Sequence, residues 1–213
     1  RAILDRIEDS STGEILLPEF HVEIPAQRVT QAISTAGVLG DGIWSKFPFL
    51  EGAKPPTSNL AELILNRTWR PSLEITGVEG IPEMAIAGNV LRTHTTLKLS
   101  CRIPAGVDSQ IAAEAMKSVL EANPPHGAEV KFSIEMPADG FHAKPLAEWL
   151  ESSLETASNS YFGGPLQYMG EGGTIPFMPM LQEKYPDAEF MITGLLGPES
   201  NAHGPNEFTH IPC

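Results

Sequence analysis

A polar loop near the carboxyl end of the chain holds the histidine with the most potential for chemistry. The loop runs from Gly197 to Glu207, and it places His203 among small and polar residues directly after an apolar segment. In open α/β sheets, ligands bind at loops that follow the carboxyl ends of strands. His203 could there ligate a metal or transfer a proton. From this loop alone, a surface histidine that caps a turn is the favoured interpretation.

The spacing of the histidines does not by itself build a metal centre. His203 and His210 are seven residues apart, unlike the two histidines of a helical His-Glu-x-x-His site. A catalytic zinc needs about three protein ligands and an open position. No compact cluster of His, Asp and Glu accompanies His203, so the chain is expected to supply at most this one ligand.

A glycine-rich turn is the second candidate. Residues 171–176 read Glu-Gly-Gly-Thr-Ile-Pro, and Pro176 marks the first turn of a helix. The glycine pair, Gly172 and Gly173, lets backbone amides approach a ligand, and a helix N-terminus binds anions, so a substrate carboxylate could bind here. The stretch lacks the lysine of a phosphate loop and the spacing of a dinucleotide loop. A tight turn that joins a coil to a helix is the simpler alternative.

Three more side chains are weighed one by one. Arg102 lies on the polar face of a predicted strand, and its planar guanidinium suits carboxylates, although an ion pair or plain solvation is favoured for a single arginine. Asn89 follows Gly88 and is interpreted as a turn residue. Cys101 points to the buried face of the same strand, so a nucleophilic role is not expected.

Periodicity predicts the elements that position these residues. The clearest strand covers 95–103, where apolar and polar residues alternate. A helix capped by Asp108 or Ser109 follows it and carries apolar residues at helical spacing. The other elements of this half are a helix in 1–8, a strand at 72–80 and a strand at 129–136. The order helix, strand, strand, helix, strand matches a split β-α-β (ferredoxin-like) plan that lacks its first strand.

The remaining segments favour helices and one buried strand. Pro25 opens a short helix, and Asn59 with Glu62 resembles a capping box for a helix that ends at Asn66. A long helix is predicted over 145–162 and a short one after Pro176. Residues 190–196 are almost all apolar, which predicts a strand buried on both faces of an α/β sheet.

These elements divide the chain at a predicted boundary, Pro137–Gly140. The first domain, residues 1–137, is expected to be α+β and to carry an insert at about 14–68. The second, residues 138–213, is expected to be α/β. The length of 213 residues fits one large domain or two small ones.

Composition excludes several classes of partner. The net charge of −13 disfavours nucleic acid and anionic membrane surfaces, and no apolar run is long enough to span a bilayer. Two cysteines give neither a disulfide framework nor a cysteine zinc cluster. A reducing compartment fits this cysteine usage, and a cytoplasmic location is expected. No signal peptide is visible, but a missing N-terminus would hide one. The missing initiator Met and the stop just after Pro212 lead us to expect a fragment.

Several motifs together resemble the zinc-dependent aminoacylase/carboxypeptidase superfamily. Residues 200–207 are similar to the loop that carries its last zinc ligand, and residues 171–176 to its Glu-Gly-Gly-Ser/Thr-Ile-Pro turn. The stretches 70–73 and 77–80, with Asn89 thirteen residues before Arg102, resemble the carnosinase and cytosolic dipeptidase branch.

The resemblance implies a role for each candidate. Residues 1–137 would be most of a lid that dimerises, and 138–213 the C-terminal part of the catalytic domain. His203 would bind one of two zinc ions. The substrate's carboxylate end would be held by Arg102 and by Thr174, with Gly173 beside it, while Asn89 would reach the site of the partner subunit.

The family's remaining zinc ligands and its general-base glutamate lie upstream of the lid. We therefore expect the C-terminal portion of a zinc-dependent metallopeptidase or amidohydrolase that cleaves dipeptides or N-acyl amino acids, inactive by itself and homodimeric through its lid. The alternative is a non-catalytic dimerisation or substrate-binding module. A small-molecule carrier built on the glycine-rich turn has only that turn in its support.

Overall fold

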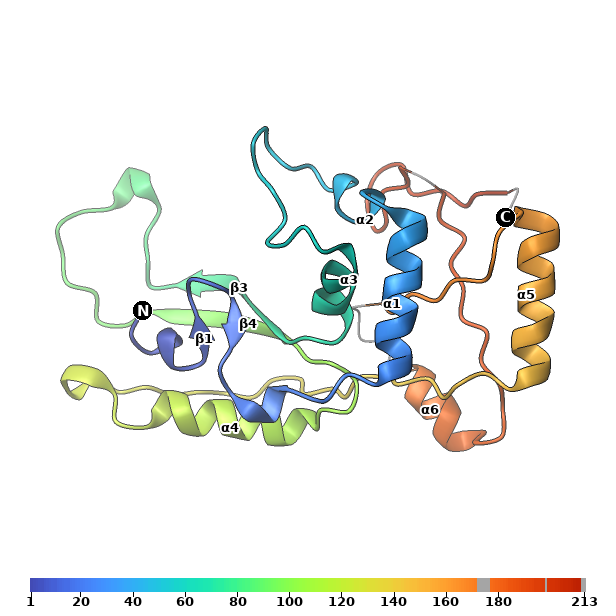
Figure 1. Cartoon of the computed structure of the whole chain (residues 1–213). Helices are drawn as coiled ribbons and strands as arrows, with labels where there is room; N and C mark the ends of the chain where they lie inside the picture. The colour runs from blue at the N-terminus through green and yellow to red at the C-terminus, as the bar shows by residue number, and fades with distance from the viewer. Residues whose placement is uncertain (172–176, 198, 212–213) are drawn as a thin grey trace. The chain divides into compact units, whose positions relative to one another are not determined.

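The computed structural model describes residues 1–171, 177–197 and 199–211 of the chain (Figure 1). The protein is a mixed α/β structure with two small antiparallel sheets, which confirms the predicted class. It forms two compact units, neither of them one continuous stretch. Unit 1 comprises Arg1–Val29, Leu65–His142 and Gly170–Met180, and unit 2 comprises Thr30–Ile64, Ala143–Met169 and Leu181–Cys213.

The main sheet of unit 1 is the antiparallel pair β3 (Ser72–Glu79) and β4 (Thr96–Arg102). Both strands were predicted. The register places Leu73 opposite Cys101, with an irregularity between Ile75 and Gly77. Along β4, exposed and partly buried residues alternate without a break, as the sequence pattern requires of a strand with one solvated face. A second, shorter pair is β1 (Glu8–Asp9) with β2 (Glu14–Ile15).

Helix α4 (Ser109–Glu121) contributes one face to the buried core of unit 1. The Asp108 carboxylate accepts the amide of Ile111 at 2.9 Å, so the predicted N-cap is confirmed. Ala112, Met116 and Leu120 recur every four residues and are buried. They form one core with residues of β3 and of the N-terminal segment: Ile7, Ile15, Leu17, Phe20, Leu73 and Val107.

Arg6 ties the N-terminal segment to the other end of α4. Its guanidinium donates to the carbonyls of Val119, Ala122 and Asn123, the last at 2.9 Å. The last carbonyls of a helix have no partner within it. One arginine therefore satisfies the C-terminus of α4 and fixes the segment 1–8 beside it.

Two predicted elements of unit 1 are wrong. Residues 1–8 form a single 3-10 turn, η1 (Leu4–Arg6), and then enter β1 instead of continuing as a helix. Residues 129–135 alternate as predicted, although Met136, expected to face inward, is exposed. The segment forms no ladder, and the amide of Phe132 donates to the Glu121 carboxylate at 2.7 Å instead. Val130 and Phe132 still pack against the core, so the apolar pattern fixed their burial and not their pairing.

The helices that remain were largely predicted. Asn59 accepts the amides of Ala61 and Glu62 and so starts α3, and Gly163 ends α5 in the left-handed conformation with φ 71°. The helices are α1 (Ala26–Leu39), α2 (Gly42–Ser45), α3 (Leu60–Thr68), α5 (Glu148–Phe162) and α6 (Phe177–Lys184). Short 3-10 turns are η2 (Pro18–Phe20), η3 (Met84–Ile86) and η4 (Pro125–Gly127).

In unit 2, residues 166–168 run between α1 and α5 (Figure 1). On the α1 side, the Thr35 hydroxyl donates to the carbonyl of Tyr168 at 2.6 Å. On the α5 side, the Tyr168 hydroxyl donates to Glu151, and the amide of Leu166 donates to Glu155. Since each contact joins a helix to the same short segment, this segment links the two helices.

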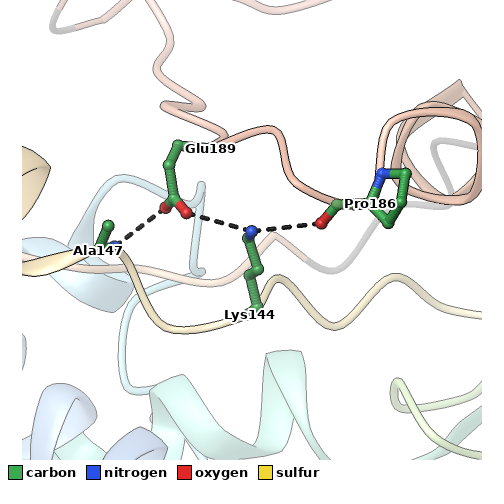
Figure 2. Close-up of polar contacts among 4 residues, drawn as sticks. All are labelled: Lys144, Ala147, Pro186 and Glu189. Carbon is green, nitrogen blue, oxygen red and sulfur yellow. Dashed lines mark hydrogen bonds and ion pairs between the residues drawn. The ribbon is translucent and has the colours of Figure 1, made fainter.

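A second polar contact holds the start of α5 (Figure 2). One oxygen of Glu189 accepts the amide of Ala147 at 3.0 Å, and the other pairs with Lys144 at 3.1 Å. Lys144 also donates to the carbonyl of Pro186 at 3.4 Å. Glu189 thus caps a helix that begins 41 residues before it. No residue at the start of α5 does this locally, because the N-cap position is Ala147.

The predicted strand at 190–196 is wrong. Among the described residues this segment forms no strand: Leu196 makes an isolated bridge to Thr209, and the carbonyl of Leu195 accepts the amide of His210. Met191, Ile192 and Leu195 are at least half exposed, so the segment is not buried on two faces. An apolar run predicts burial, but a strand also needs neighbours to pair with. Within the described ranges, no helix is long and apolar enough to cross a membrane.

Replacing Glu189 by Gln should lower stability at neutral pH and flatten its acid dependence. The amide of Ala147 and Lys144 both lower the pKa of Glu189 below its usual 4.5. A lowered pKa in the folded state stabilises the fold above the unfolded-state pKa, and this contribution is lost as pH falls through the folded pKa. Urea unfolding followed from pH 7 to pH 3 should show the variant's deficit shrinking below about pH 4.5.

Glu148→Gln is the matched control, because Glu148 lies in the first turn of the same helix. If Glu148→Gln reproduced the effect, general helix-dipole electrostatics would account for it and the specific cap would not.

Candidate functional site

Arg102 is the candidate that the sheet presents most directly. It ends β4 on the exposed face, directly opposite Ser72 of β3. Within the described part of the chain its guanidinium has no ion-pair or hydrogen-bond partner. Lys98 lies on the same face but is paired with Glu135 at 2.9 Å, which raises the pKa of Lys98. Of these two cations, Arg102 is the one available to a carboxylate.

Cys101, one residue earlier, faces the other way. It packs against the core of unit 1, as predicted from the alternation. Burial, with a smaller contribution from the charge of Glu8, raises the pKa of the Cys101 thiol to about 11. The thiolate is the nucleophilic form. Cys101 is therefore a core residue, and its thiol is a poor nucleophile at neutral pH.

Asn89 lies in the long connection between β3 and β4. Gly80 opens this connection with φ 84°, and a Cβ there would lie 2.5 Å from the carbonyl oxygen of His94. Glycine is thus required where the two ends of the connection approach each other. Asn89 is exposed, and its apolar neighbours Met84 and Leu91 are almost fully exposed as well. The side chain of Asn89 is available for an interaction outside unit 1.

His203 is presented by a closed loop of unit 2. The bridge between Leu196 and Thr209 closes the loop, and the amide of His210 donates to the carbonyl of Leu195 at 2.7 Å. Inside it, the backbone amide of His203 donates to Glu207 at 3.2 Å. The imidazole itself is exposed and forms no hydrogen bond within the described residues. The ring is therefore available as a ligand or a base.

The predicted site residues are distributed over the two units. Arg102 and Asn89 belong to unit 1, and His203 belongs to unit 2. Gly173 and Thr174 of the predicted glycine-rich turn lie outside the described residues. Among the residues that are described, no group of three His, Cys, Asp or Glu side chains could hold a metal ion. His203 fits the role of one metal ligand, and the described residues do not complete a site around it.

A histidine that the sequence places in a boundary loop has a more specific environment in unit 1. The His142 ring stands edge-on to Trp69 at 5.1 Å between centroids, and Arg28 donates to its Nε2 at 3.4 Å. Burial first, and the charge of Arg28 second, lower the pKa of His142. The sequence carried no signal for this cluster, because its three residues come from distant segments.

An acidic pocket of about 440 Å³ lies along α5 and is lined by Glu148, Glu151, Ser152, Glu155, Leu166 and Tyr168. Two of its carboxylates accept hydrogen bonds that hold the segment after the helix, from Leu166 to Glu155 and from Tyr168 to Glu151. Glu151 and Glu155 therefore stabilise the local structure. None of the predicted site residues lines the pocket.

Comparison with known families decides the relationship. Residues 14–128, just over half of the chain, match the family described as the peptidase dimerisation domain of M20 peptidases. The chain belongs to this M20 family. The matched range contains β3, β4 and α4, and with them Arg102 and Asn89. The predicted family resemblance is confirmed.

Individual relatives agree with the M20 assignment. A cysteinylglycine-S-conjugate dipeptidase of Corynebacterium striatum is 28% identical over 148 residues, which cover 67% of this chain and 32% of that protein. Among solved structures, human carnosine dipeptidase 1 has a TM-score of 0.60 and 19% identity, over 85% of this chain and 39% of that one.

Two further M20-type structures share the fold. The metallo-carboxypeptidase Sso-CP2 from Sulfolobus solfataricus has a TM-score of 0.65 and 17% identity, over 99% of this chain and 47% of that one. The dipeptidase Dug1p from Saccharomyces cerevisiae has a TM-score of 0.65 and 20% identity, over 98% and 43%. The chain thus spans 32% to 47% of the length of these relatives.

Cys101 should react slowly with alkylating reagents in the folded M20 chain. A pKa of about 11 instead of 9.0 leaves about a hundredfold less thiolate at pH 8. In a Cys213→Ser background, which leaves one thiol, the rate of iodoacetamide modification should be at least about a hundredfold lower in buffer than in urea. Equal rates in the two conditions would contradict the burial of Cys101.

Proposed function

We propose that this chain is the C-terminal portion of a zinc-dependent metallopeptidase or amidohydrolase that cleaves dipeptides or N-acyl amino acids. The observation that carries the proposal is the match of residues 14–128 to the dimerisation domain of M20 peptidases. The dipeptidase of Corynebacterium striatum supports a short peptide as substrate. Within this proposal, residues 1–137 form most of the lid and residues 138–213 the end of the catalytic domain.

Arg102 is proposed to bind the substrate's free carboxylate. Its position on the solvated face of β4 and the absence of a partner among the described residues both support this role. A guanidinium can donate two parallel hydrogen bonds to a carboxylate, which fixes both the position and the orientation of the substrate. Thr174 and Gly173 are proposed to hold the same end of the substrate.

His203 is proposed to be one of the zinc ligands. Its exposed imidazole has no hydrogen-bond partner among the described residues, so a nitrogen lone pair is available. A zinc site of this kind supplies a water nucleophile at neutral pH and polarises the scissile carbonyl. What this chain contributes is the position of the ligand, which the closed loop around His203 fixes.

The exposed Asn89 is proposed to act across a homodimer, in the site of the partner subunit. Its place on a long connection that leaves the sheet supports contact with another chain. A cytoplasmic location belongs to the same proposal, because cytosolic dipeptidases are among the proteins that the sequence resembles. The 213 residues by themselves are proposed to be inactive, because the resemblance assigns the other ligands to an upstream segment.

A second function, from another class, is favoured by the dimerisation-domain match itself. In this alternative the chain is a dimerisation or substrate-binding module without chemistry of its own. Both functions share the homodimer, and they differ in whether the complete protein turns over a substrate.

Replacing Arg102 by Ala in the complete protein should impair the cleavage of dipeptides that have a free carboxylate. A charge-assisted hydrogen bond contributes about 1.5–3 kcal/mol, so kcat/KM should fall about ten- to a hundredfold. The same dipeptides with an amidated C-terminus should be cleaved equally well by the two proteins, because they offer Arg102 no carboxylate.

Lys98→Ala is the matched control for this experiment. It removes a cation from the same face of the same strand, but one that is already paired with Glu135. Equal losses on free and amidated peptides would contradict the carboxylate role of Arg102. Absence of turnover on every dipeptide and acyl-amino acid tested would favour the module instead.

Light scattering tests the homodimer directly. The chain should elute with a mass near twice 23.0 kDa, because closed two-fold assemblies are the commonest outcome of a self-complementary surface. The mass should not change when the protein is diluted from about 100 µM to about 1 µM if the dimer has a nanomolar Kd. A monomer at every concentration would contradict the proposed homodimer.

A further inference from the structure

We infer that Glu207 is a positioning residue for His203: its carboxylate binds the His203 backbone amide and thereby fixes the direction in which the loop presents the imidazole. The inference deepens the proposed function, since it rests on His203 as a metal ligand. It starts from a contact in which the side chain that follows His203 by four residues turns back onto the backbone of His203.

The first step is the conformation of the loop. His203 has φ 61°, and Glu199 and Asn206 also lie in the left-handed region, at 64° and 70°. This region is uncommon for residues other than glycine, and Glu tolerates it less well than His or Asn, so the surrounding structure must hold Glu199 above all. A loop with three such residues is not kept in place by backbone preference alone.

The base of the loop is held by backbone pairing and by one serine. Beyond the bridge of Leu196 to Thr209, the Ser200 hydroxyl accepts the amide of Phe208 at 3.0 Å and donates to the carbonyl of Phe208 at 3.3 Å. Ser200 thus reproduces a pair of ladder contacts with a side chain. These contacts fix the base and do not reach the tip, where His203 lies.

The tip is held by a turn and by Glu207. The amide of Gly204 donates to the carbonyl of Asn201 at 3.0 Å, and the amide of Glu207 donates to the carbonyl of Gly204 at 3.3 Å. A Cβ at Gly204 would lie 2.6 Å from Nδ2 of Asn201, so the Asn201 side chain packs close under the turn. The amide of His203 is then accepted by Glu207 at 3.2 Å.

These contacts divide the polar groups of His203 between two tasks. Its backbone amide is committed to Glu207, while its ring forms no hydrogen bond within the described residues. Because the amide and the Cα–Cβ bond belong to the same residue, fixing one in the turn restricts the other. Residues that orient a metal ligand without touching the metal typically change metal affinity by about 10–100-fold.

The test separates hydrogen bonding from charge and from direct ligation. In the complete protein, Glu207→Ala should weaken zinc binding about 10–100-fold, measured by competition with a chelating indicator. Glu207→Gln keeps an acceptor oxygen at the same chain length and should remain within about threefold of the parent, an allowance for a neutral acceptor. Glu199→Ala, which removes another acid with positive φ from the same loop, should leave zinc affinity unchanged.

A second readout does not depend on metal. In the metal-free 213-residue chain, Glu207→Ala should speed hydrogen exchange of the His203 amide and shift its NMR signal, while Glu207→Gln restores both. The midpoint of thermal unfolding should be the same in the parent chain and in both variants, because the Glu207 contact is exposed and local.

The outcomes are distinct. Unchanged zinc affinity and unchanged exchange in Glu207→Ala would overturn the positioning role, and a Glu207→Gln variant as weak as Glu207→Ala would mean that the carboxylate acts by its charge or as a ligand itself. If His203→Ala bound zinc as tightly as the parent, the proposed ligand would be wrong. The exchange of the His203 amide would then still decide whether Glu207 positions this residue.

Discussion

The apolar contact between α4 and the inner side of β3 and β4 is the constraint on which unit 1 depends. Met116 and Leu120 on the helix share one buried core with Leu73 of β3, against which Leu99 and Cys101 of β4 pack, and each large buried side chain stabilises the fold by about 1.5–3 kcal/mol. Successive strand residues point to opposite faces, so this contact also fixes what lies outside. With Cys101 inward, Arg102 has to face solvent, and a register slip of one residue would bury its charge.

Polar contacts fix the helix ends, which the apolar core does not determine. The two ends of α4 need partners for their free amides and carbonyls, and beside the local cap Asp108 several of these partners come from far along the chain. Ser109 donates its amide to Asp139 at 2.9 Å, which lowers the pKa of Asp139, and Arg6 binds the carbonyls at the other end. Glu189 does the same for α5 in unit 2. Long-range caps of this kind stabilise each helix and at the same time fix the path of the segment that supplies them.

The parts of the fold that could be predicted from the sequence are those that do not depend on such long-range contacts. Helices α4 and α5 and strand β4 carry their own periodic signal, so their existence follows from local sequence. The errors at 129–136 and 190–196 share one cause, since a strand is defined by a pairing partner that local sequence does not name. In 129–136 that partner proved to be the carboxylate of Glu121. The alternation over 129–136 still predicted the partial burial of Val130 and Phe132, whereas the apolar run at 190–196 is largely exposed.

The same distinction applies to the candidate site. The exposed face of Arg102 followed from alternation alone, and the inward position of Cys101 came with it. The role inferred for Glu207 could not be predicted, because its partner is a backbone amide, which every residue has. An acid four residues after a loop histidine is the only sequence signal, and it becomes meaningful only once the left-handed conformation of His203 is known.

The proposed binding of a substrate carboxylate by Arg102 would have to act over a short range. The net charge of −13 opposes the approach of a carboxylate, but beyond about 8–10 Å exposed charges are largely screened at physiological salt. Inside that distance a single unpaired cation decides the local field. Arg102 has no partner among the described residues on its face of β4, whereas Lys98 is neutralised by Glu135. His203 is comparable: its backbone amide is bound to Glu207, while its imidazole has no hydrogen bond within the described residues. In both residues the fold fixes the backbone and leaves the polar end of the side chain without a partner among the described residues. The proposed site would be preorganised in this way, because little ordering would then remain to oppose binding.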